Sequence, residues 1–167
     1  DEAVALLRQR PDVVHSLDAD ANTPLHAACA SPHISLELVN ALLLEGASTS
    51  AKNDDGYTAF HVACLNTADH NGHSLKKYLL FKAAVAPNQR TSRGETAAHL
   101  CARHDKHLDS LKYLTSAGVD LSITALTPSD SADVGSPRRK SALEVAQQSG
   151  VRARRCADVL KIASADS

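Results

Sequence analysis

The sequence predicts an all-α fold in which helix–turn–helix units stack into a solenoid. One observation is a recurring hexapeptide, which first appears over residues 23–28 as Thr-Pro-Leu-His-Ala-Ala. The copies that begin at Thr58 and Thr96 keep the threonine and the histidine, and an altered fourth copy begins at Ser141. A second observation is the spacing of these starts, 35, 38 and 45 residues, which is typical of repeat arrays rather than of a single globular core. In such an array, function lies on an extended surface.

Composition agrees with closely packed helices and argues against several classes of function. Hydrophobic residues make up 43% of the chain, but it has only two Phe, three Tyr and no Trp. Such a small-residue core suits helices in close contact and suits an aromatic-lined ligand cavity poorly. The net charge of −1 and the sequence pI of about 6.8 indicate no general attraction to nucleic acid or to a membrane surface. No apolar run approaches the ~20 residues that span a bilayer.

The first complete unit shows how the local sequence specifies each element. Thr23 is an N-cap residue and Pro24 fits the first helical position, so a short inner helix is expected over 25–30. Apolar residues at helical spacing predict a second, outer helix over 34–44, which Gly46 ends as a left-handed cap. The polar connection that follows, called the finger below, carries an Asp-Gly turn signal before the next threonine.

Three features together resemble the ankyrin repeat. They are the Thr-x-x-His copies, the leucine–glycine–alanine run over 43–47, and a glycine two residues before Thr58 and Thr96. The resemblance covers nearly the whole chain and implies a single domain, 1–167, of about four to five repeats. It divides the chain into a partial repeat (1–22), a repeat (23–57), a repeat with an insertion between its helices (58–95), a further repeat (96–126), a long finger insertion (127–140) and a degraded terminal repeat (141–167).

The chain departs from the ~33-residue ankyrin period in two places. The second unit carries about five extra residues, best placed at 66–72, and the fourth about twelve, best placed at 126–140. Ala21 stands where the finger usually has glycine, and Glu144 replaces the motif histidine. Because buried interfaces between repeats should hold the array together, Leu43→Ala is expected to cost a few kcal/mol.

Each motif histidine is closely followed by a cysteine, a pattern that suggests metal ligands. The resemblance instead implies a structural role, in which the histidine bonds the threonine hydroxyl and the backbone of the neighbouring finger. Packed helices lie ~10 Å apart, whereas zinc ligands converge on the metal at ~2.0–2.3 Å. Free cysteine in a buried helix is a compact hydrophobic residue. No metal is therefore expected, and the structural residues are Thr23, His26, Thr58, His61, Thr96 and His99.

Nothing in the sequence has the pattern of a catalytic site. His104 and His107 flank Asp105, but no nucleophile accompanies them in a recognisable arrangement. The sequence also contains no glycine-rich phosphate loop and no zinc-protease motif, so neither enzymatic activity nor a cofactor is expected. Cysteines that recur with the repeats indicate packing rather than a disulfide framework, which favours an intracellular compartment, cytoplasmic or nuclear.

The resemblance places function on the concave face, where ankyrin domains usually bind partners with finger tips and the exposed ends of the first helices. Carried over position by position, the candidate partner-binding residues are Asp20, Asn22, Asp54, Asp55, Tyr57, Leu65, Asn66, Arg93, Glu95, Arg103, His104, Arg138 and Arg139. The early fingers are acidic and the late ones basic, which would orient an extended partner; the alternative is that these charges are only solvated. Tyr57 and Leu65 are the best anchor candidates, because apolar anchors carry more interface energy than charges at the rim.

The insertion over 127–140 contains a possible regulatory site. Ser136 is followed by Pro-Arg-Arg, a proline-directed kinase pattern, and its phosphate would pair with the neighbouring arginines. The same basic run is a weak nuclear-localisation or nucleic-acid patch. No aromatic residues are interleaved for base stacking, so nucleic acid is the disfavoured partner.

The sequence therefore predicts a protein–protein interaction scaffold that binds a partner protein or peptide and has no catalytic activity of its own. We expect a monomeric domain within a longer chain, with no membrane partner. One alternative is a regulatory or substrate-recruiting module of a multidomain enzyme, of kinase, acyltransferase, GTPase-activating or ubiquitin-ligase adaptor type. Another is nucleic-acid binding through the C-terminal arginines, which predicts an affinity that falls steeply with salt.

Overall fold

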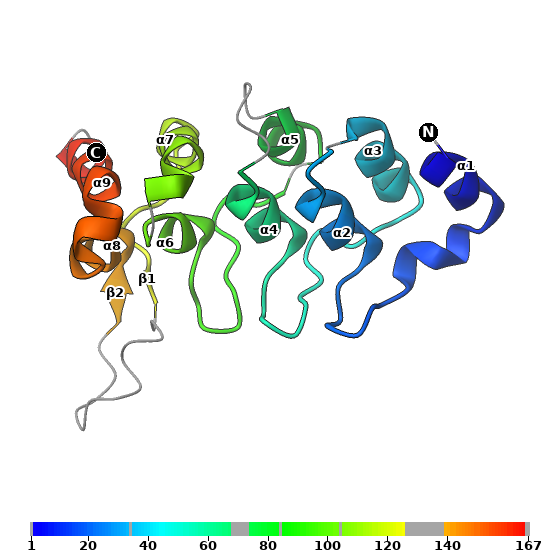
Figure 1. Ribbon diagram of the computed structural model, residues 1–167, viewed down its shortest axis with the longest axis horizontal. Helices are drawn as coiled ribbons and strands as arrows, with labels where there is room; N and C mark the ends of the chain where they lie inside the picture. Colours follow the sequence, from blue (N-terminus) through cyan, green and yellow to red (C-terminus); the bar gives the residue numbers. More distant parts are fainter. Residues whose placement is uncertain are drawn as a thin grey trace. The chain divides into compact units, whose positions relative to one another are not determined.

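The computed structural model describes residues 2–33, 35–67, 74–83, 85–103, 105–125 and 139–165. It divides into two compact units, Asp1–Ala86 and Pro87–Ser167, called unit 1 and unit 2 here. Within each unit, helices lie in pairs and turn-rich fingers project from the inner helices (Figure 1). The predicted all-α repeat architecture is confirmed, whereas the single continuous domain over 1–167 stays a prediction.

Unit 1 contains an outer helix followed by two helix pairs. Helix α2 packs against α3, its partner in the first complete repeat, and against α4, the inner helix of the next repeat. The outer helices α1 and α3 also pack against each other (Figure 1). The elements are α1 (Glu2–Gln9), the 3-10 helix η1 (Pro11–His15), α2 (Pro24–Ala30), α3 (Leu36–Leu44), α4 (Ala59–Leu65), α5 (Ser74–Lys77) and the π-helical turn η2 (Tyr78–Lys82).

Unit 2 contains two helix pairs and a short β ladder between them. Helix α6 packs against α7 and α8, and α9 packs against α7 and α8. The two strands pair antiparallel, with Thr124 opposite Ser141 and Ala125 opposite Lys140, and flank residues 126–138, which lie outside the described ranges. The elements are α6 (Ala97–Cys101), η3 (Asp105–His107), α7 (Leu108–Ser116), β1 (Thr124–Ala125), β2 (Lys140–Ser141), α8 (Ala142–Gln148), η5 (Gly150–Ala153) and α9 (Arg154–Ala165).

Small residues let the inner helices approach one another closely. In α4, Ala63 and Cys64 are completely buried, and Phe60, 1% exposed, is the largest fully buried side chain among the residues whose burial is described. The four cysteines are free thiols in buried positions, which confirms their predicted packing role: Cys29, Cys64, Cys101 and Cys156.

The outer helix of the first repeat, α3, starts later than the range predicted from the sequence, 34–44. It begins at Leu36, because the Ser35 hydroxyl accepts the backbone N–H of Leu38 and caps the helix there. The leucine that enters the core is Leu42, 2% exposed, and Leu43 is only half-buried. The cost of a few kcal/mol expected for Leu43→Ala stays a prediction, with Leu43 half-buried rather than in the core.

The fingers that lead to Thr23, Thr58 and Thr96 each reverse at a residue with a left-handed backbone, two positions before the capping threonine. The φ angle is 78° at Gly56, 79° at Gly94 and 58° at Ala21. In the second finger, bonds from Asn53 N–H to the Tyr57 carbonyl (3.0 Å) and from Gly56 N–H to the Asn53 carbonyl (2.8 Å) close the turn. The Cβ of Ala21 makes this conformation unfavourable by about 1–2 kcal/mol.

Ala21→Gly is expected to raise the free energy of unfolding by about 0.5–1 kcal/mol, because glycine adopts the left-handed conformation without a steric penalty. Urea denaturation measures the change. Ala19→Gly on the same finger is the matched control: the φ angle of Ala19 is not positive, so added chain entropy should lower stability by about 0.5 kcal/mol. Equal effects of the two substitutions would contradict the role assigned to Ala21.

Candidate functional site

A histidine bridge joins the first repeat to the finger that follows it. The backbone N–H of Thr23 donates to Nδ1 of His26 at 3.2 Å, and the Thr23 hydroxyl lies 2.8 Å from the same nitrogen. Because Nδ1 accepts, the ring proton is on Nε2, which lies 2.9 Å from the carbonyl oxygen of Tyr57 and donates to it. His26 therefore caps its own helix and holds the next finger.

Two further copies keep the capping bonds of this arrangement. Thr58 N–H donates to Nδ1 of His61, and Thr96 N–H donates to Nδ1 of His99, each at 3.2 Å. Nε2 of His99 lies 3.1 Å from the carbonyl oxygen of Lys140, the residue before the fourth capping position. For His26 and His99, these bonds are the ones that the resemblance implies for the threonine and histidine pairs.

The fourth copy keeps the cap but changes its chemistry. Ser141 N–H donates to Oε2 of Glu144 at 2.8 Å, and Glu144 N–H donates to the Ser141 hydroxyl at 3.3 Å. An ionised carboxylate only accepts hydrogen bonds. Glu144 therefore reproduces the capping half of the histidine bridge without a group that donates to a finger.

Burial makes the histidine bridge of unit 2 sensitive to acid. It lowers the pKa of His99 below the ordinary value of 6.5, and the positive charges of Arg103 and Arg90 add to this effect, while the Lys140 carbonyl opposes it. The unfolded chain therefore binds a proton at this site more readily than the folded chain. The stability that neutral His99 contributes is present above pH 6.5 and is lost as the pH falls below it.

We expect the free energy of unfolding to fall between about pH 7.5 and about pH 5, and to fall less in His99→Gln, which has no proton to bind at this site. Urea denaturation of both proteins at a series of pH values measures the two slopes. Identical slopes would show that protonation of His99 does not contribute.

Two side chains of unit 1 that were predicted to contact a partner, Asn22 and Asn66, also join neighbouring repeats, and their contact with a partner stays a prediction. Nδ2 of Asn53 donates to Oδ1 of Asn22 at 2.8 Å. Nδ2 of Asn66 donates to the carbonyl oxygens of Cys29 (2.8 Å) and Ser31 (2.9 Å), which end helix α2. Asn22 and Asn66 thus hold fingers and helix ends in place, a role that sequence reasoning missed because their partners lie a full repeat away.

The acidic candidates of unit 1 are exposed. Asp54 N–H donates to the Asp20 carbonyl at 3.1 Å, so the two fingers lie side by side. The carboxylates of Asp20, Asp54 and Asp55 are exposed to solvent there. Tyr57 and Leu65, the predicted anchors, are both half-buried.

Asp18 is a further residue that shapes the first finger. Its carboxylate accepts hydrogen bonds from the Asn22 side chain (3.1 Å) and from the backbone N–H groups of Asn22 (2.8 Å) and Asp20 (2.9 Å). The bonds from Asn22 are the main reason that the pKa of Asp18 is lowered. The first finger therefore has a fixed turn that presents Asp20.

In unit 2, the surface position predicted for Glu95 is wrong. Its side chain is 2% exposed and forms an ion pair with Arg103, whose own side chain is 25% exposed. Burial raises the pKa of Glu95, and the charges of Arg103 and Arg93 offset part of that increase. Of the two partners, only Arg103 keeps a surface that another molecule can reach.

The remaining predicted residues of unit 2 divide into exposed and undescribed positions. Arg93 and Arg139 are exposed. His104, Arg138 and the candidate phosphorylation site Ser136 lie outside the described residues, so these three stay predictions.

Burial makes two of the thiols, those of Cys29 and Cys156, poor nucleophiles. It raises the pKa of Cys29 to about 12, and at Cys156, where Asp105 adds to the effect, also to about 12. In the part of the chain that the structure describes, no three potential ligands gather as a metal site. No helix over these residues is both long and apolar enough to cross a membrane.

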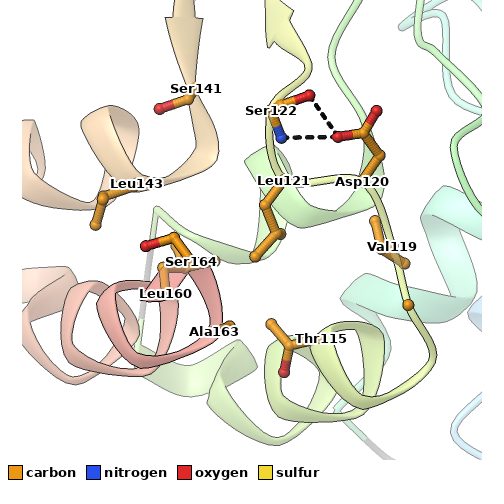
Figure 2. Close-up of a pocket in the computed structure, with 11 residues that line it drawn as sticks. Thr115, Val119, Asp120, Leu121, Ser122, Ser141, Leu143, Leu160, Ala163 and Ser164 are labelled. Carbon is orange, nitrogen blue, oxygen red and sulfur yellow. Dashed lines mark hydrogen bonds between the residues drawn. The ribbon is translucent and has the colours of Figure 1, made fainter. Parts of the chain in front are cut away.

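A pocket of about 550 Å³ lies in unit 2, between the C-terminal ends of α7 and α9 and the loop 119–122 (Figure 2). Leu121 points into it, and Leu143 lines it from the start of α8. The Asp120 carboxylate accepts hydrogen bonds from the hydroxyl (2.6 Å) and backbone N–H (2.9 Å) of Ser122, and these bonds lower the pKa of Asp120. The carboxylate therefore shapes the loop, and no sequence motif predicted this pocket.

The geometry defines a repeat protein built from stacked helix pairs joined by turn fingers. A family model described as Ankyrin repeats (3 copies) matches residues 1–82 and 35–125. The chain belongs to the ankyrin repeat family. No curated protein matches it. Ankyrin repeats are generally protein-interaction modules and are typically non-catalytic, so the class of function is the binding of protein partners.

Proposed function

We propose that this chain binds a protein or peptide partner on its finger tips and the adjoining ends of its inner helices, and that it carries out no reaction of its own. The observation that carries the proposal is the pair of joined fingers in unit 1, where Asp54 N–H donates to the Asp20 carbonyl. Three exposed carboxylates, those of Asp20, Asp54 and Asp55, belong to this pair. A partner segment with basic side chains would complement them.

Two half-buried side chains give this surface apolar contacts beside its charges. Tyr57 follows the acidic turn, and its ring centroid lies 6.3 Å from that of His61, which limits the positions the ring can take. Leu65 ends the inner helix α4. Aromatic and apolar anchors beside polar neighbours are typical of the residues that dominate binding energy.

Unit 2 offers basic side chains at the corresponding positions. Arg93 lies in one finger, and Arg139 stands at the base of the next. Arg103 is paired with buried Glu95 and presents only part of its guanidinium. Exposed charges of this kind speed and orient association more than they raise affinity, so we expect acidic groups on the part of the partner that meets unit 2.

Affinity capture from a cell lysate, read by mass spectrometry, tests this proposal. The baits are the intact chain and a finger variant that carries Asp54→Ala, Asp55→Ala and Tyr57→Ala. Proteins captured by the intact chain should fall at least about tenfold with the finger variant, which corresponds to about 1.4 kcal/mol of binding free energy.

A matched control keeps the same chemistry but places it on the outer helix. It carries Glu37→Ala, Leu44→Ala and Glu45→Ala, which remove two exposed carboxylates and an exposed apolar side chain from α3 and its C-cap. Circular dichroism checks that all baits fold. Capture that survives in the finger variant, or that is lost equally in the control, would contradict binding at the fingers.

A further inference from the structure

The finger that leads to Thr96 has a fixed turn that carries two charged residues. The hydroxyl oxygen of Thr91, which is 3% exposed, accepts the backbone N–H groups of Arg93 (3.2 Å) and Glu95 (3.1 Å). The N–H of Thr91 donates to the Glu95 carbonyl at 2.8 Å, and the N–H of Gly94 donates to the Thr91 carbonyl at 3.0 Å. The turn therefore needs no partner to form, and a binding group placed on it is preorganised.

Three guanidinium groups lie around this turn, with one carboxylate among them. Arg103, which follows helix α6, forms an ion pair with Glu95. Nη1 of Arg90 lies 3.9 Å from the position that a Cβ on Gly94 would occupy. Arg93 stands in the turn itself, and its charge, like that of Arg103, offsets part of the increase that burial causes in the pKa of Glu95. Three positive charges and one negative charge leave a net charge of +2 here.

Much of this charge has no counterpart inside the protein. Glu95 bonds Nη2 of Arg103, whose guanidinium has further N–H donors and whose side chain is 25% exposed. The exposed side chain of Arg93 forms no hydrogen bond or ion pair with any residue that the structure describes. The carboxylate of Asp120 also interacts with Arg90, but this is the smallest cause of its lowered pKa. Guanidinium N–H groups therefore remain open to a ligand at this surface.

We propose that these three arginines, called the arginine cluster below, bind a phosphorylated side chain of the partner. The inference rests on the proposed function, because it specifies the acidic group expected opposite unit 2. A phosphate monoester carries about −1.5 to −2 charges at pH 7, which matches the net charge of the cluster, whereas a carboxylate would neutralise only half of it. Arginine also pairs with phosphate oxygens through parallel N–H bonds. Glu95 is a positioning residue, since it holds Arg103 against the turn.

Two features favour a phosphorylated peptide over nucleic acid at this cluster. Residues 87–103, which contain the finger and helix α6, include no aromatic side chain on which a base could stack. The arginines also gather at one turn, which suits a single phosphate group better than a backbone of regularly spaced phosphates. The cluster shares its finger with the surface that the proposed function assigns to a protein partner.

A titration of the full, ¹⁵N-labelled chain with a short phosphopeptide tests the proposal. The probe is the blocked pentapeptide Gly-Gly-pSer-Gly-Gly, and the matched probe has aspartate in place of the phosphoserine. We expect saturable shifts of the side-chain Nε–H signals of Arg93 and Arg103 in NMR spectra. The dissociation constant of the phosphopeptide should be at least about tenfold lower than that of the aspartate peptide.

Variants tie this affinity to the cluster. Arg93→Gln should weaken phosphopeptide binding by at least about tenfold. Arg103→Gln alone would leave a buried carboxylate unpaired, so it is combined with Glu95→Gln, and this double variant should lose as much. The matched control is Arg154→Gln, which removes an exposed arginine from α9 of the same unit and should bind like the original chain. Circular dichroism checks that each variant folds.

Three results would overturn the proposal. They are equal affinities for the two peptides, an equal loss of affinity in the Arg154→Gln control, and a short oligouridine that binds the cluster more tightly than the phosphopeptide. Lysate capture separates this inference from the proposed function. Capture that the finger variant loses but that prior phosphatase treatment of the lysate leaves unchanged would overturn the phosphate site alone. Capture that the finger variant keeps would contradict the proposed function, even if the cluster bound the phosphopeptide.

Discussion

Phe60→Ala is expected to lower the free energy of unfolding by about 3–5 kcal/mol. Phe60 is 1% exposed in α4 and is one of only two phenylalanines in the chain. Its neighbours along the inner helix, Ala59 and Ala63, are too short to fill the space that the ring leaves. The loss therefore combines the hydrophobic transfer of a large ring with the cost of a cavity. Urea denaturation followed by far-UV circular dichroism measures it.

Phe60→Leu separates the two contributions, since leucine keeps most of the apolar volume. It should cost about 1–1.5 kcal/mol, and hydrogen exchange should locate the destabilisation of Phe60→Ala in unit 1. An alanine variant that unfolds at the same urea concentration as the leucine variant would show that the inner helices collapse around the missing ring.

His26→Ala is expected to lower the free energy of unfolding by about 2–4 kcal/mol, because it leaves buried hydrogen-bonding groups without their partner. The N–H of Thr23 loses its acceptor, and the carbonyl of Tyr57 loses the donor that holds the next finger. His26 itself is 1% exposed, so water cannot replace these bonds without opening the structure. Chemical denaturation gives the stability, and amide exchange at residues 53–57 reports the finger.

His15→Ala is the matched control, since His15 is exposed at the end of η1. It should change stability by no more than about 0.5 kcal/mol. If exchange in the finger were as slow in His26→Ala as in the original chain, the histidine would cap its helix without holding the next repeat.

Local chemistry made the helix caps of the repeats predictable, and the resemblance to the ankyrin repeat implied the bonds from the motif histidines to the next fingers. Thr23, Pro24 and His26 lie within four positions of one another, so the cap that they form depends on few other residues. The finger turn at Gly56 was predictable for the same reason, because its left-handed backbone conformation favours glycine. At the equivalent position of the first finger, Ala21 adopts this conformation with a steric penalty.

Contacts between repeats were not predictable in the same way. Glu95 was expected at the surface, because a charged residue in a finger is normally exposed. In the structure it is buried and forms an ion pair with Arg103, and the local sequence pattern does not indicate this contact. Leu42, rather than Leu43, lies in the core, and the run of three leucines over 42–44 does not by itself indicate which side chain turns inward. Asn22 and Asn66 bond to residues 31 to 37 positions away, and nothing in their own neighbourhoods indicates this.

Because Glu144 replaces the histidine in the last copy of the motif, the series of histidine bridges can be extended by a further repeat before this copy but not after it. His26 and His99 each offer an N–H to the finger that comes next, whereas the carboxylate of Glu144 offers only lone pairs. If a designed repeat were inserted before Ser141, Nε2 of His99 in the third repeat could donate a hydrogen bond to its finger. If the same repeat were appended after α9, the carbonyl oxygen of its finger would face the Glu144 carboxylate, and two acceptors cannot form a hydrogen bond. The substitution Glu144→His would therefore be needed to supply the missing N–H donor.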